Sequence, residues 1–323
     1  MFPLFRAFLL GLFVSGLCLP CLVRADEPKA EPKQEEKAKA EDGSTPVVKL
    51  TNPGTEPRRQ LRYNFKKSTP YEAIMDMKMG SAVQINENKL PPQKMPTTRM
   101  AMTIEPKEVK EDGTLTYSFA FTEISILEDE PLPPAIRERM SVEMNKLTGL
   151  KGTATVNSRG ITESVDFELP ANATPQMTQM MQSIRQSMGR MSNPLPDEPV
   201  GLGGAWETDQ SFNTNGINAQ QKVTTSIESL DETSCKLALE LKQHADKQAI
   251  NSPNAPAGTS ITLESMEGSG KGLMQLEFAS VVPDSQVSLV TQTQMSFEQA
   301  GMTQSMKMTM DMDMKIYRKM EKK

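Results

Sequence analysis

Residues that commonly carry out catalysis are scarce in this sequence of 323 residues. His244 is the single histidine, and it lies among charged residues without a nucleophile at a suitable spacing. Acyl-transfer triads and zinc sites usually require several His, Cys or carboxylate groups. Cys235 alternates with the residues around it as a small buried hydrophobe would. We therefore expect a protein that is not an enzyme and that has no catalytic residues.

Paired carboxylates and glycine-rich segments are the other candidates for chemistry. Asp311 and Asp313 alternate with lysines on one side of a strand-like pattern, which indicates a solvated face and not a desolvated acid. The segments 200–204 and 268–272 are rich in glycine but lack the spacing of nucleotide-binding loops. We predict that both segments are turns.

Methionine is unusually frequent, with 24 copies, and many copies occupy every second position. The alternation runs from Met306 to Met314, and shorter copies occur at 75–79 and 100–102. A period of two predicts a β-strand with one buried face and one solvated face. Thioethers fill irregular gaps in cores, and they are also soft ligands for Cu(I). We expect packing and no cofactor, with Cu(I) binding as the alternative.

The elements that position these residues are predicted to be mainly strands. An Asp-Gly turn is expected at 112–113, and a change of phase predicts a β-bulge at 122–123. Helical spacing predicts two helices, 133–147 and 175–191. The expected fold is mainly β (α+β), a long-stranded antiparallel sheet curled into a half-barrel or open barrel. Its two amphipathic helices would cover the concave side.

The chain divides into three predicted parts. Residues 1–25 have the pattern of a secretory signal peptide, and 26–58 have the polar composition of a disordered linker. Residues 59–321 would form a single β-rich domain, which could consist of two related halves, 59–199 and 200–321. The net charge of −5 argues against nucleic acid as a partner. The expected location is the periplasm or the extracellular space.

Two motifs carry a resemblance to a known group of proteins. The segment 61–66 (LRYNFK) and the segment 199–207 (PVGLGGAWE) resemble those of an uncharacterised family of exported bacterial proteins. The resemblance covers about residues 59–319. It implies an exported β-rich domain of unknown function and supplies no catalytic residues.

The expected function is that of an exported, non-enzymatic binding or envelope-associated protein that carries a lipid or another hydrophobic molecule. The alternatives are a Met-rich Cu(I)-binding protein and a purely structural or protein-interaction module. The sequence leaves membrane contact and oligomeric state open. The residues expected to line the apolar cavity are Met75, Met77, Met100, Met102, Phe119, Phe121, Met177, Met181, Ile184, Met308, Met310 and Met312.

Overall fold

A computed structural model describes most of the chain. The described residues are 45–66, 68–168, 194–214, 216–250, 259–299 and 301–319, together with positions 178, 181, 182, 184, 185 and 188. Residues 1–25, expected to be a signal peptide, and residues 26–44 of the expected linker lie outside this set. Residues 47–52 of that linker form a strand, because Val47, Val48 and Leu50 suit an extended edge.

The strands form one antiparallel sheet in the order β1-β9-β10-β11-β13-β14-β15-β2-β5-β6-β7-β8, with β3, β4 and β12 paired beside this path. The edge strands β1 and β8 are not paired with each other, so the sheet is not closed into a barrel. The strand bounds are β1 (Val47–Asn52), β2 (Tyr71–Ile85), β3 (Asn88–Lys89), β4 (Gln93–Lys94), β5 (Thr98–Val109), β6 (Leu115–Ile126), β7 (Lys151–Val156), β8 (Thr162–Phe167), β9 (Ala205–Thr214), β10 (Ile217–Leu230), β11 (Ser234–Ala245), β12 (Gln248–Ile250), β13 (Thr259–Glu277), β14 (Asp284–Gln299) and β15 (Met302–Arg318).

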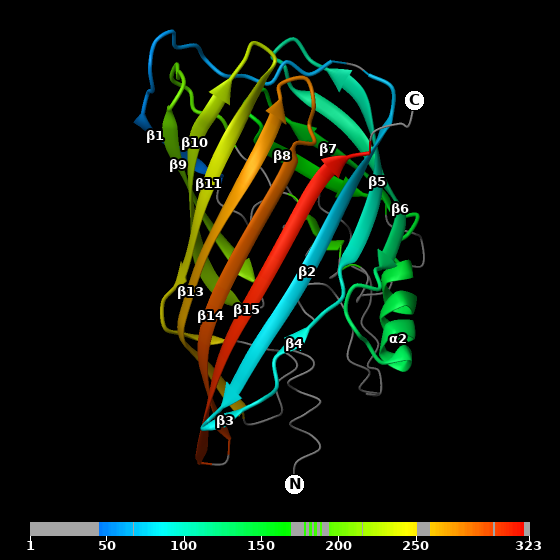
Figure 1. The fold of residues 1–323 in the computed structure, drawn as a ribbon, viewed down its shortest axis with the longest axis vertical. Coiled ribbons are helices and arrows are strands. Elements are labelled where there is room, and N and C mark those ends of the chain that lie inside the picture. Colours follow the sequence, from blue (N-terminus) through cyan, green and yellow to red (C-terminus); the bar gives the residue numbers. More distant parts are fainter. Residues whose placement is uncertain are drawn as a thin grey trace, which may run out of the picture.

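The methionine alternation at the end of the chain forms β15, as the period of two predicts. This strand pairs with β14 on one side and with β2 on the other, so late and early parts of the sequence meet in the middle of the sheet (Figure 1). Register places Met312 opposite Met79 and Met314 opposite Met77. The methionines of both strands therefore share one face.

Two local predictions are confirmed. Asp112 and Gly113 form the turn between β5 and β6, where Gly113 has a φ of 82° and the Asp112 carboxylate accepts a hydrogen bond from the Thr114 N–H at 2.9 Å. The predicted bulge lies at Thr122: Met102 is opposite Phe121, whereas Ala101 is opposite Glu123.

The prediction that 268–272 is a turn is wrong. These residues lie inside β13, which is 19 residues long. Gly268, Gly270 and Gly272 alternate with outward-facing Ser269 and Lys271, and none of the three glycines has a positive φ. A Cβ added at Gly270 would lie 2.5 Å from the Ser288 carbonyl oxygen. Glycine is present because the strands are crowded here, and the chain does not reverse.

The expectation of two covering helices is not matched. One helix, α2 (Pro134–Asn145), is described, and it corresponds to the first expected helix. It lies beside β6 and buries Met140 and Met144 (Figure 1). The second expected helix, 175–191, lies mostly outside the described residues. Within the described part of the chain, no helix has the length and apolar composition needed to cross a membrane.

Two groups of buried apolar residues hold the sheet together. The first, here called the large cluster, combines residues from β6 and β8, such as Phe119 and Val165, with Trp206 of β9 and Leu237 of β11. These strands are far apart in the sheet order, so the sheet must curl to bring them into one core (Figure 1). The second, here called the small cluster, lies toward the other ends of the strands and includes Leu263, Met295 and Met306.

An extended segment, 59–66, crosses the large cluster and fixes this curl. The Tyr63 N–H donates to the Ser158 carbonyl in the β7–β8 turn at 2.8 Å, and the Asn64 N–H donates to the Phe278 carbonyl after β13 at 2.7 Å. The side chains of Leu61, Tyr63 and Phe65 are buried. The segment therefore links two regions of the sheet that are not neighbours in the strand order.

Candidate binding surface

The concave face of the sheet has a regular surface because the strand register aligns residues in rows. Three of these rows cross β9, β10, β11, β13, β14, β15 and β2, a fourth runs from β11 to β2, and each is named here after its residue in β15. The Met312 row consists of Thr208, Val223, Leu241, Gly270, Leu289, Met312 and Met79. The Met310 row consists of Gln210, Gln221, Gln243, Gly268, Thr291, Met310 and Ser81.

Two further rows flank these. The Met314 row consists of Trp206, Thr225, Leu239, Gly272, Val287, Met314 and Met77. The Met308 row includes Ala245, Met266, Thr293, Met308 and Val83. These four rows contain no Asp, Glu, Lys, Arg or His. The part of these rows that is not buried is therefore an uncharged surface, which is suited to an apolar partner.

The middle of this face is left partly exposed. Met306 is 4% exposed and belongs to the small cluster, but the side chains of Met308, Met310, Met312 and Met314 are only partly buried. The large cluster covers one end of the strands and the small cluster covers the other. Thioethers between the two clusters therefore remain accessible from the concave side.

The predicted lining residues divide between packed and accessible positions. Met100, Phe119, Phe121 and Met181 are buried in the large cluster, and Met75, Met102 and Ile184 pack against it. These seven residues therefore lie in, or pack against, the buried core at that end of the sheet. Met308 packs against the small cluster. Met77, Met310 and Met312 belong to neither cluster, and Met177 lies outside the described residues.

Polar residues on the concave face were not singled out from the sequence. Gln243 donates through Nε2 to Oε1 of Gln221 at 2.8 Å, and Thr291 Oγ1 donates to Oε1 of Gln243 at 3.5 Å. These side chains are partly buried. The sequence nevertheless contains a signal for Gln221 and Gln243. The residues two positions before and after each of them, which share its face of the strand, are Ala, Val or Leu.

The convex face carries the charges. Arg99 forms two hydrogen bonds of 2.7 Å with the Asp76 carboxylate, and these raise the pKa of Arg99 further. Lys222 pairs with Glu207 at 3.0 Å. Strand alternation thus separates a charged outer side from an uncharged inner side.

His244 and the two carboxylates considered from the sequence lie on the convex face. His244 at the end of β11 contacts Asp246 and Glu267 at 3.0 and 2.6 Å, and these hydrogen bonds raise its pKa. Asp311 and Asp313 are exposed on β15, and Ser288 donates a hydrogen bond to Asp313. In the described ranges, three or more His, Cys, Asp or Glu residues are nowhere grouped so that they could hold a metal ion.

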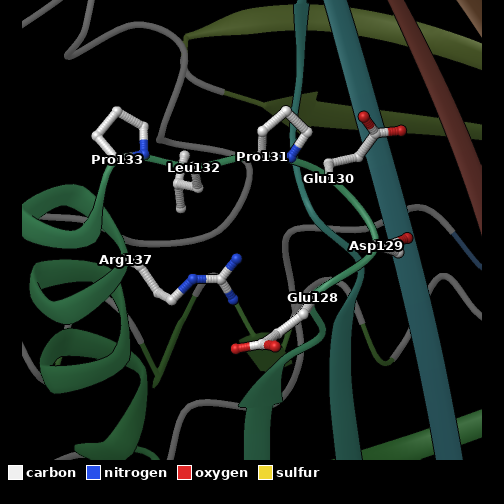
Figure 2. Close-up of a pocket in the computed structure, with 7 residues that line it drawn as sticks. All are labelled: Glu128, Asp129, Glu130, Pro131, Leu132, Pro133 and Arg137. Carbon is white, nitrogen blue, oxygen red and sulfur yellow. The ribbon is translucent and has the colours of Figure 1, made fainter.

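A pocket of about 620 Å³ lies between β6 and α2 and is formed by residues 128–133 and Arg137 (Figure 2). Asp129 accepts hydrogen bonds from the Thr97 hydroxyl at 2.6 Å and from the Thr97 N–H at 2.9 Å. Lys78 pairs with Asp129 and Glu130 at 3.2 and 2.8 Å. Because these carboxylates are already engaged, we interpret this pocket as a structural connection between β6 and α2.

Comparison with known proteins gives no identity. No protein-family model matches the chain, and no curated protein matches it. The residues of the concave face therefore carry the functional argument.

Proposed function

We propose that the protein is an exported, non-enzymatic binding protein whose concave face takes an apolar ligand. The observation that supports this is the partial exposure of Met308, Met310, Met312 and Met314 between two buried clusters. Large apolar side chains on a curled sheet are normally buried by folding, since burial stabilises by about 25 cal/mol per Å². A ligand placed against these thioethers would complete that burial.

The proposal is tested by titrating the fluorescent probe N-phenyl-1-naphthylamine into the wild type and three variants. Met312→Gln keeps the side-chain size but makes it polar, and Met312→Glu adds a charge on the same face. Thr309→Glu is the control, because Thr309 lies on the convex face of the same strand. We expect Met312→Gln to bind several-fold more weakly, with a larger loss for Met312→Glu and no change for Thr309→Glu.

Circular dichroism of each variant shows whether it is folded, and Met312→Gln is the variant that best preserves packing. Native mass spectrometry of protein taken from the cells that make it would show a bound apolar molecule. Absence of probe binding by the wild type, or equal binding by wild type and Met312→Gln, would refute the proposal.

Cu(I) binding is the second candidate, and one observation favours it. Met77 and Met79 of β2 lie opposite Met314 and Met312 of β15, which places four thioethers in a two-by-two group on one face. Thioether sulfur is a soft ligand that suits Cu(I). Competition with bathocuproine disulfonate under ascorbate should show a site that Met79→Leu and Met312→Leu weaken. The control is Met302→Leu at the exposed start of β15. An equal copper affinity in all of these proteins would exclude this group.

A further inference from the structure

The Met310 row is a polar line across an otherwise apolar face. On either side of it, the Met312 row and the Met308 row are dominated by Leu, Val, Met and Ala. A side-chain amide on an apolar surface lowers the stability of the fold unless it is hydrogen-bonded. Three adjacent strands nevertheless place Gln210, Gln221 and Gln243 side by side. This arrangement requires an explanation beyond packing.

The hydrogen bonds within the row run in one direction. Thr291 donates to Gln243, and Gln243 donates to Gln221. The amide oxygen of Gln221 therefore accepts one hydrogen bond, while its amide nitrogen has no partner among the described residues. Each side-chain amide offers two N–H donors, so the row ends in donor groups that face the partly exposed centre.

A second polar group lies beside this row. Thr208 is 6% exposed and follows the alternation that puts Trp206 and Gln210 on the concave side. Its Oγ1 is buried and has no hydrogen-bond partner in the described part of the chain. A buried hydroxyl without a partner is uncommon, because leaving one unpaired is unfavourable. Thr208 therefore adds an independent sign that a polar group of a ligand belongs near this point.

The chemistry of the rows limits what that polar group can be. A charged group would lose its hydration and find no counter-ion, since the four rows have no ionisable residue. A purely apolar chain would cover the Gln221 amide and the Thr208 hydroxyl without satisfying them. A hydroxyl group both donates and accepts, and it is neutral.

We infer that the ligand is a neutral amphiphile with a hydroxyl group between two apolar parts, and that the Met310 row together with Thr208 binds this hydroxyl. The inference rests on the proposed function, because it specifies the ligand of the same surface. The apolar parts would lie against the partly exposed side chains of Met312 and Met314 on one side and of Met308 on the other.

The test compares two esters that differ by one hydroxyl, methyl 12-hydroxystearate and methyl stearate, as competitors of N-phenyl-1-naphthylamine on the full protein. We expect the hydroxylated ester to displace the probe at about tenfold lower concentration, which is the scale of one added hydrogen bond. Gln221→Met and Gln243→Met keep the side-chain length but remove the amide. Both variants should lose the preference, so that the two esters displace the probe at equal concentrations.

Gln292→Met is the matched control, because Gln292 is exposed on the convex face of β14. It should keep the full preference. Equal displacement by the two esters in the wild type would overturn the inference and leave the proposed function intact. A preference that survives in both Gln221→Met and Gln243→Met would overturn the assignment to this row. Failure of the probe itself to bind would overturn the proposed function, and the inference with it.

Discussion

Substitution of Gly270 by alanine tests the close approach of β13 and β14. An added Cβ would lie 2.5 Å from the Ser288 carbonyl oxygen and 3.2 Å from the Leu289 Cα. Both atoms belong to the backbone of the neighbouring strand, so they cannot move aside as a flexible side chain can. Overpacking of this kind costs about 1–3 kcal/mol, whereas the lower entropy of the unfolded chain offsets about 0.4–1 kcal/mol. We expect a net loss of about 1–2 kcal/mol in the free energy of unfolding.

The assay is urea unfolding followed by the fluorescence of Trp206, which is the single tryptophan and is fully buried. Gly80→Ala is the matched control, because its added Cβ would meet the carboxylate of Asp311, the movable end of a side chain. We expect Gly80→Ala to lose less stability than Gly270→Ala, because the exposed side chain of Asp311 can rotate away from the added Cβ. If Gly270→Ala were as stable as the wild type, the crowding argument for this strand would be wrong.

Three other predictions follow from single contacts. Trp206→Phe removes the hydrogen bond from Nε1 to the Pro194 carbonyl at 3.0 Å, and it should lower the free energy of unfolding by about 1–3 kcal/mol in urea titrations followed by circular dichroism. Hydrogen bonds from Thr97 hold the pKa of Asp129 at about 2, below its usual value near 3.9, so this group stabilises the fold above pH ~4. That contribution should disappear as the pH falls from about 4 to 2, and Asp129→Asn should flatten this part of the stability profile. Burial raises the pKa of Cys235 to about 12, so peptide mapping should find its thiol unlabelled by iodoacetamide at pH 8 until the protein is unfolded. Rapid labelling of the folded protein would contradict this.

The sequence predicts individual strands well because alternation is a local property. The period of two locates β15, and the change of phase in β6 locates the bulge at Thr122. The prediction of a turn at 268–272 failed because glycine is common both in turns and where two strands approach closely. Only the position of β14 in the structure shows that the second explanation applies here. Local pattern does not encode which strands become neighbours.

The candidate site shows the same limit. Gln221 and Gln243 lie on different strands, and only the register of β10 with β11 places them side by side. The sequence predicted Met77, Met310 and Met312 as lining residues together with Met100 and the phenylalanines of β6, and it did not separate the residues outside the clusters from those inside them. That separation depends on the two clusters, whose members come from distant parts of the chain.

The pairing of β15 with β2 has a consequence for how the nascent chain matures. β15 fills the position between β14 and β2, so the sheet is incomplete until the segment ending at Arg318 has been synthesised. Before that point, β2 and β14 would each offer an unpaired edge that could recruit another chain. Pairing across so long a stretch of sequence is intrinsically slow. A polypeptide with this connectivity cannot complete its sheet before β15 is available to pair with both β14 and β2.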